Sequence, residues 1–171
     1  MIPVYIPECA ERLLARSAWF SDPQVFQRAR LAPANRLARL IGSPTFAKRS
    51  DIAATTLGRN IYFQAARHFD PHSPGGLSLL AHEFKHVEQI GRKGLFRFYL
   101  QYLLDYLRSG YGENMPQEAE AYELGRVVYA HIRAEMLANP GIPMCLGKDG
   151  AHRPNPEFVL IAPAPFYAGQ L

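Results

Sequence analysis

Two histidines and a glutamate stand at a spacing that could hold a metal ion. His82, Glu83 and His86 form the pattern His-Glu-x-x-His. Residues four apart on a helix lie one above the other, so His82 and His86 could present two imidazole nitrogens to one ion. Glu83, one step around the helix, could reach a metal-activated water without being a ligand. The pattern predicts a zinc-hydrolase site with Glu83 as the general base.

A third ligand must come from elsewhere, because a catalytic zinc ion usually has three protein ligands and an open position. Residues 116–139 predict a helix, with Pro116 at its first position and acids in its first turn. Glu118 and Glu120 would face different sides of that helix, so only one can bind the ion. Ala121 shares the face of Glu118 and would let the two helices approach closely. We predict Glu118, with Glu120 as the alternative.

The rigid first turn of a helix is a better platform for a ligand than a loop, which favours Glu118 and Glu120 over the other candidates. His68 and His72 fall in a loop rich in Pro and Gly. The remaining candidates are Asp105, Glu113, Glu123 and His131.

The residues around the motif determine which elements would position it. Apolar residues at three- and four-residue spacing predict a helix from about 77 to 90, ended by Gly91. Before it, residues 52–64 predict a β-hairpin, with a turn at Gly58 and Asn60. The outer strand of this hairpin, with Ile61, Tyr62 and Phe63, would offer backbone groups to an extended peptide.

The remaining segments are interpreted as structural elements around the site. Helices are predicted at 8–20, from about 23 to 30, and at 34–41. Residues 94–109 are apolar nearly all round and predict a buried core helix, with an interfacial helix or a tyrosine-lined substrate groove as alternatives. Residues 140–171, rich in Pro and Gly, predict a tail that is packed on the domain or partly disordered, with one strand at 158–161.

Length and composition narrow the class of protein. The chain has 171 residues and a net charge of +4, typical of one globular domain. The basic stretch 12–49 lacks a recognition motif, so we expect no nucleic-acid binding. Cys9 and Cys145 lie far apart and outside a Cys-x-x-Cys spacing, so reduced thiols in a cytosolic protein are the default expectation, with a single bridge as the alternative. No signal peptide or transmembrane segment is recognised, so cytoplasmic localisation is the default, with export by a dedicated secretion system left open.

Three blocks of sequence together resemble a known family. They run from Thr56 to Phe63, from Leu79 to Gln89, and from Asn114 to Ala121. The motif from His82 to His86, with a Glu-x-x-Ala on a later helix, looks like the gluzincin branch of zinc metallopeptidases. More narrowly, the three ordered blocks are similar to a bacterial family known as a core domain associated with extracellular contractile injection systems. The resemblance covers about residues 50–130.

The resemblance implies a fold, a site and an activity. The fold would be α+β, mainly α: a minimal zincin-like domain over residues 1–139, with its core at 50–139, a helical N-terminal scaffold at 8–41, and a small sheet packed on the active-site helix. The first Glu of the Glu-x-Glu-Ala block matches Glu118. Gln89 matches a frequent Gln after the second His, whereas Tyr122 stands where related families often have Asp or Asn.

The expected function is a zinc metallopeptidase that uses one Zn²⁺ ion on a peptide or protein substrate, with association with a secretion system. Tyr122, His131, or an Arg or Tyr of the aromatic helix could stabilise the oxyanion. The alternative is a catalytically weak or inactive metal-binding effector or interaction module.

Overall fold

The protein is described from a computed structural model, which is mainly helical with a small three-stranded sheet, as the sequence predicts. The described residues are 8–16, 19–33, 54–63, 70, 73–146 and 153–154. The predictions for the helix at 34–41, for His68 and His72, and for the strand at 158–161 lie outside the described residues.

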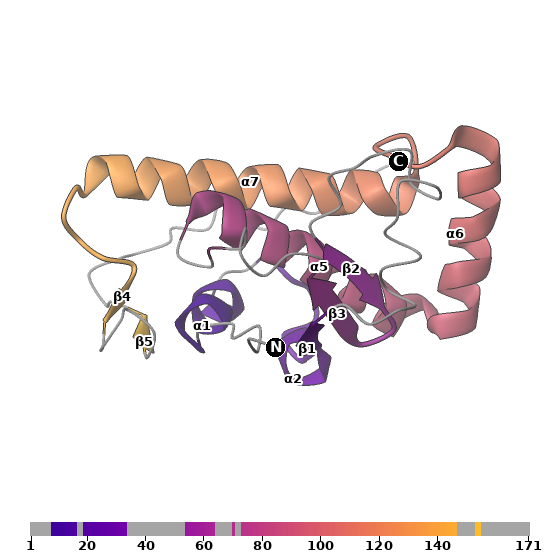
Figure 1. Cartoon of the computed structure of the whole chain (residues 1–171), viewed down its shortest axis with the longest axis horizontal. Helices are drawn as coiled ribbons and strands as arrows, with labels where there is room; N and C mark the ends of the chain where they lie inside the picture. The colour runs from indigo at the N-terminus through magenta and orange to yellow at the C-terminus, as the bar shows by residue number, and fades with distance from the viewer. Residues whose placement is uncertain are drawn as a thin grey trace.

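Two long helices form the body of the molecule. Helix α5 (Pro74–Lys93) begins at Ser73, whose side chain accepts a hydrogen bond from the Gly76 amide. It therefore starts three residues earlier and ends later than the sequence predicts. Helix α7 (Pro116–Ala138) lies along it (Figure 1). The two helices approach closely at Gly125, where a Cβ atom would lie 3.2 Å from the Ser78 hydroxyl oxygen.

The sheet lies against α5 and has the strand order β1-β3-β2. Strands β2 (Ala54–Leu57) and β3 (Asn60–Phe63) form the predicted antiparallel hairpin, and β1 (Arg30–Pro33) pairs with β3 in parallel. Gly58 has φ +64°, which suits the two-residue turn. The prediction that Ile61, Tyr62 and Phe63 form the outer strand is wrong, because β1 covers the far side of β3. Among the described strands, β1 and β2 form the two edges of the sheet, and β2 is the edge of the hairpin itself.

The N-terminal helices are shorter than predicted. Helix α1 covers Glu8–Arg16, and α2 covers only Val25–Arg28 before the chain extends into β1. The connection between them is tied to the back of α5 by the buried Glu88. Its carboxylate accepts hydrogen bonds from the Ser21 hydroxyl and the Asp22 amide, each at 2.9 Å. This polar anchor fixes the N-terminal segment on α5.

The apolar core lies where the N-terminal segment, the sheet and α7 meet α5. Phe84 of α5 is buried, with its ring centroid 4.8 Å from that of Phe26 in α2. Ile61 of β3 and Leu80 of α5 are also buried in this core, as is Val128 of α7. Helix α5 therefore packs on several sides.

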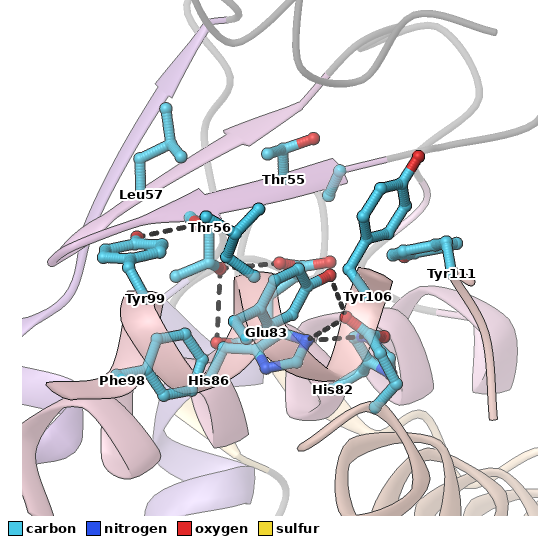
Figure 2. Close-up of a pocket in the computed structure, with 14 residues that line it drawn as sticks. Thr55, Thr56, Leu57, His82, Glu83, His86, Phe98, Tyr99, Tyr106 and Tyr111 are labelled. Carbon is cyan, nitrogen blue, oxygen red and sulfur yellow. Dashed lines mark hydrogen bonds and ion pairs between the residues drawn. The ribbon is translucent and has the colours of Figure 1, made fainter. Parts of the chain in front are cut away.

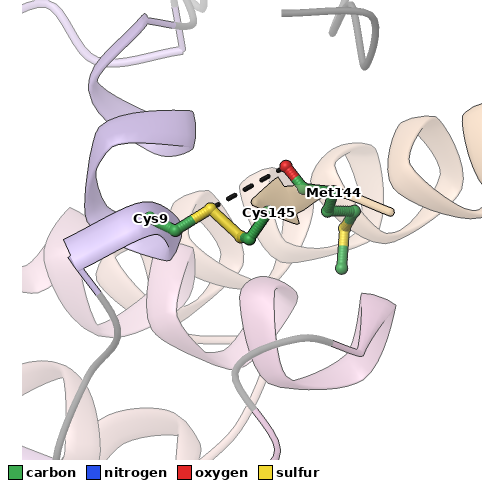
Figure 3. Close-up of a disulfide and its surroundings, with 3 residues drawn as sticks. All are labelled: Cys9, Met144 and Cys145. Atoms are coloured by element: carbon green, nitrogen blue, oxygen red, sulfur yellow. Dashed lines mark hydrogen bonds between the residues drawn. A yellow bond between two sulfur atoms is a disulfide. The ribbon is translucent and has the colours of Figure 1, made fainter. Parts of the chain in front are cut away.

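Cys9 and Cys145 form a disulfide, which contradicts the prediction of reduced thiols. The bond joins α1 to strand β4 (Cys145–Leu146), which pairs with β5 (Arg153–Pro154) (Figure 3). Both cysteines are buried. The prediction is wrong because it took a long separation in sequence as a sign of distance in space. After α7 the chain comes back to α1, which brings the two cysteines together.

Helix α6 (Leu95–Ser109) stands at the opposite end of the molecule from the disulfide (Figure 1). The prediction of a buried core helix is wrong, because Phe98 is its only buried residue. Its inner face contacts the hairpin and the start of α7, and its outer face is exposed. None of the helices within the described residues is long and apolar enough to cross a membrane.

Candidate metal centre

Three side chains from α5 and α7 converge on one point. The Nε2 atoms of His82 and His86 are 3.2 Å apart. Each lies 3.5 Å from an oxygen of Glu118, which α7 brings across from the other side. The structure thus joins the motif to the predicted third residue, across a sequence separation that no local pattern could bridge. This group could hold a metal ion.

The spacing of these donors fits a single small ion. Donor atoms about 2.0–2.1 Å from a tetrahedral zinc ion lie about 3.3 Å from one another. The observed separations of 3.2 and 3.5 Å are close to this value. In addition, Glu118 Oε2 is buried, and among the described residues nothing donates a hydrogen bond to it. An unpaired buried carboxylate oxygen is costly, and a cation would satisfy it.

The charges of Glu118 and His86 depend on each other. Burial opposes the negative charge of Glu118, but the attraction of His82 and His86, each 3.5 Å away, outweighs it and holds the Glu118 pKa well below its usual range. Burial alone would lower the pKa of His86, whereas the Glu118 carboxylate raises it to about 9. The two shifts have one cause, the attraction between the Glu118 carboxylate and the imidazole of His86.

A chain of hydrogen bonds links His86 to Gln89 and Gln89 to Glu120. His86 Nδ1 lies 3.1 Å from Gln89 Oε1, so an N–H at Nδ1 can donate there and leave Nε2 free to bind an ion. Gln89 Nε2 in turn donates to Glu120 at 2.8 Å. The alternative prediction of Glu120 as ligand is wrong, because this carboxylate faces Gln89, Lys85 and Arg92 instead. Gln89, which matches a frequent Gln of the related families, therefore contacts both His86 and Glu120.

Glu83 lies beside the three donors without joining them. The Thr56 hydroxyl donates a hydrogen bond of 2.6 Å to Glu83 Oε2. This contact from β2 orients the carboxylate and leaves Oε1 without a hydrogen bond from the described residues. Glu83 lines the same cavity as His82 and His86. It is therefore placed to exchange protons with a group bound there.

The cavity has a volume of about 390 Å³ and lies between β2, α5 and α6. Figure 2 shows Thr55, Thr56 and Leu57 of β2 across the cavity from the two histidines. A further wall of the cavity is aromatic and is formed by α6 and the loop after it. Its residues are Phe98, Tyr99, Tyr102, Tyr106 and Tyr111.

Tyrosine hydroxyls lie at the Glu118 side of the cavity, and one of them contacts Glu118 directly. Tyr102 donates a hydrogen bond of 2.7 Å to Glu118 Oε1. Burial and the nearby carboxylate both raise the pKa of Tyr102, so its hydroxyl stays protonated and can keep donating. Burial likewise raises the pKa of Tyr111, which is hydrogen-bonded to Tyr122.

Of the two named candidates for stabilising the oxyanion, Tyr122 lies beside the site and His131 does not. The ring of Tyr122 packs edge-on against His82, with centroids 4.7 Å apart, so it borders the site. His131 is wrongly predicted, because its ring packs near Trp19 with centroids 6.0 Å apart. It is thirteen residues beyond Glu118 on α7, or about 20 Å along the helix axis.

Thr56, Tyr102 and Tyr111 were not predicted as individual site residues. Thr56 belongs to a strand that the sequence identifies, but only the observed strand order brings its side chain to Glu83. The tyrosine spacing in 94–109 gave a signal for a tyrosine-lined groove. It could not specify which hydroxyl reaches Glu118.

Comparisons with known proteins agree with part of the resemblance. A family model described as the eCIS core domain matches residues 42–94. This range contains the hairpin and α5 with His82, Glu83 and His86, but it ends before α6 and Glu118. It is shorter than the range over which we expected the resemblance. No curated protein and no solved structure matches the chain significantly. The resemblance to the eCIS core family is therefore supported over the motif region.

Proposed function

We propose that this protein is a zinc-dependent peptidase. The observation that carries the proposal is the set of three donors from His82, His86 and Glu118, spaced for one tetrahedral ion and open to a cavity that also contains Glu83. Two imidazoles and one carboxylate are a donor set typical of catalytic zinc. A bound zinc ion would act as a Lewis acid toward water and a substrate carbonyl.

In this proposal Glu83 is the general base. Its free oxygen accepts a proton from the attacking water and delivers it to the leaving amine. Thr56 keeps the carboxylate in place through its hydrogen bond to Oε2. The hydroxyl of Tyr111, which lines the cavity and stays protonated, is our candidate donor to the developing oxyanion.

The substrate in this proposal is an extended peptide. Strand β2 is the sheet edge beside the cavity, and an edge strand offers backbone groups for pairing with a further strand. The aromatic wall opposite suits apolar side chains. The match to the eCIS core domain supports association with an injection system, and through it export from the cell.

The decisive experiment compares the zinc-loaded wild type with Glu83→Gln on a mixture of peptides. We expect cleavage by the wild type and a loss of at least about 100-fold in the variant, which removes the base. Both proteins should bind one zinc ion by elemental analysis, because Glu83 is not a ligand. A third protein, Glu123→Gln on α7, whose carboxylate pairs with Arg126, is the matched control and should cleave normally.

Two outcomes would contradict the proposal. If wild type and Glu83→Gln bind zinc equally and neither cleaves any peptide, the site is a metal-binding module without peptidase activity. If wild type fails to bind zinc after reconstitution, the metal site itself is refuted. A Glu118→Ala variant that binds zinc as tightly as wild type would refute Glu118 as the third ligand.

A further inference from the structure

The outer face of α6 carries a continuous apolar surface. Its members, here called the α6 stripe, have exposed fractions from 44% to 82%. At about 100° per residue they fall within a sector of about 100° around the helix. The α6 stripe consists of Phe96, Leu100, Leu103, Leu104 and Leu107.

The stripe is not the face by which α6 joins the protein. The inner face does that, through the buried Phe98 and two tyrosine hydroxyls. Tyr99 accepts a hydrogen bond from the Gly58 amide and Tyr102 donates one to Glu118. Figure 1 shows α6 at one end of the molecule, beyond the sheet and α7. A patch of this kind usually marks an interaction surface.

The charges beside the stripe are positive. Arg97 and Arg108 fall on the same flank of it, about 100–120° around the helix from Phe96. Arg59 is exposed in the hairpin turn, next to Gly58, where an added Cβ atom would lie 3.5 Å from the side chain of Leu95 at the start of α6. Among the described residues, no acid forms an ion pair with any of these three arginines.

The acid on α6 does not offset this charge. Asp105 Oδ2 accepts a hydrogen bond of 3.0 Å from Gln117 of α7, on the inner side of the helix. The exposed surface of α6 therefore combines leucines and a phenylalanine with uncompensated arginines.

We propose that the α6 stripe binds an anionic lipid surface, with α6 lying in the plane of the membrane interface. Its apolar side chains enter the boundary between headgroups and acyl chains, and Arg97 and Arg108 extend to the lipid phosphates. The 15 residues of α6 span about 22 Å, too short to cross a bilayer but suited to lie on it.

A second copy of the chain fits this surface less well. Pairing two α6 stripes would cover the apolar side chains but would bring together two arginine flanks, and α6 itself carries no exposed acid to balance them. An anionic lipid surface satisfies both features at once. Leu103 also lines the cavity, so binding through the stripe would bring the cavity close to the lipid.

The test is binding of the 171-residue chain to vesicles, measured by co-sedimentation. We expect binding to vesicles of phosphatidylglycerol and phosphatidylcholine in equal parts to be at least about tenfold tighter than binding to pure phosphatidylcholine, and to weaken with salt. Phe96→Ser should weaken binding by about tenfold or more. Its control is Leu137→Ser on α7, because Leu137 is 71% exposed but lies outside the stripe.

A second pair of variants tests the charge. Arg97→Glu should weaken binding to the anionic vesicles by about tenfold, whereas Arg133→Glu, the same charge change on an exposed position of α7, should have a smaller effect. Circular dichroism and thermal unfolding verify that each variant is folded, which is expected because all four side chains are exposed.

Three results would overturn the proposal. The first is the absence of binding by the wild type to anionic vesicles at low salt. The second is equal weakening by Phe96→Ser and Leu137→Ser, which would mean that the stripe is not the binding face. The third is a wild type that sediments as a dimer and does not bind vesicles, with a monomeric Phe96→Ser variant, because a second copy would then cover the stripe.

Discussion

Helices α5 and α6 follow one another with only Gly94 between them, yet α5 buries twelve of its twenty residues and α6 buries one of its fifteen. Composition alone would predict the opposite, with α6 more buried than α5. Ten residues of α6 are Leu, Phe or Tyr, whereas α5 contains two histidines, two glutamates and two lysines among others. Burial is therefore decided by which surfaces the rest of the chain brings to each helix.

The two helices differ in their neighbours. Helix α5 is covered by α7 along one side and by the sheet and N-terminal segment on others, so even its charged Glu88 is buried and hydrogen-bonded. Helix α6 meets the hairpin and the start of α7 with one face only. The enclosed helix can hold ionisable groups in a fixed geometry, whereas the exposed one offers a surface.

The largest expected contrast is in stability. Leu80→Ala in α5 should lower the free energy of unfolding by about 2–5 kcal/mol, because it leaves a cavity in the core. The same change at Leu107 in α6, which is 71% exposed, should cost less than about 0.5 kcal/mol. Urea unfolding of both variants measures this. Equal losses would mean that α6 is as buried as α5 in solution.

The next contrast concerns the end of the molecule opposite α6. Replacing Cys9 and Cys145 together with Ala should lower the free energy of unfolding by about 2–4 kcal/mol, because the disulfide closes a long loop in the unfolded chain. Wild type kept in a reducing agent is the control and should lose a similar amount. Zinc affinity should not change in either sample, and a large fall would show that the disulfide positions the site.

A smaller effect is expected from the residue behind His86. Gln89→Met in α5 should weaken zinc binding by about 10–100-fold, because it removes the acceptor for the His86 Nδ1 hydrogen. Gln101→Met in α6 is the matched control and should bind zinc normally. Gln89→Glu, which keeps an acceptor, should restore part of the affinity in a competition assay with a chromophoric chelator. Identical affinities for all three variants would refute the positioning role.

The smallest effect tests how α6 is attached. Tyr99→Phe removes a hydroxyl that accepts from the Gly58 amide at 2.7 Å and donates to the Thr56 carbonyl. The free energy of unfolding should fall by about 0.5–1.5 kcal/mol. Tyr129→Phe, at an exposed position of α7, should cost almost nothing. A larger loss in the control than in Tyr99→Phe would show that the hydroxyl contributes nothing to the attachment of α6.

Local patterns predicted the elements that depend on neighbours in sequence. The apolar spacing around His82 predicted α5, and the Gly and Asn turn predicted the hairpin, because turn geometry and helix periodicity are short-range effects. Boundaries were less accurate. The extension of α5 to Lys93 runs through Gly91, since a glycine inside a helix costs only about 1 kcal/mol and packing offsets it.

The amino-acid sequence by itself determined that His82 and His86 share one helix face, with Glu83 one step away, because 3.6 residues per turn leave no other arrangement. Only the tertiary structure decided between Glu118 and Glu120, by the rotation of α7 that points the first at the histidines and the second at Gln89. The same holds for the position of β3 inside the sheet, the Cys9–Cys145 bond and the exposure of α6. Each depends on contacts between segments far apart in the chain, which no local pattern encodes.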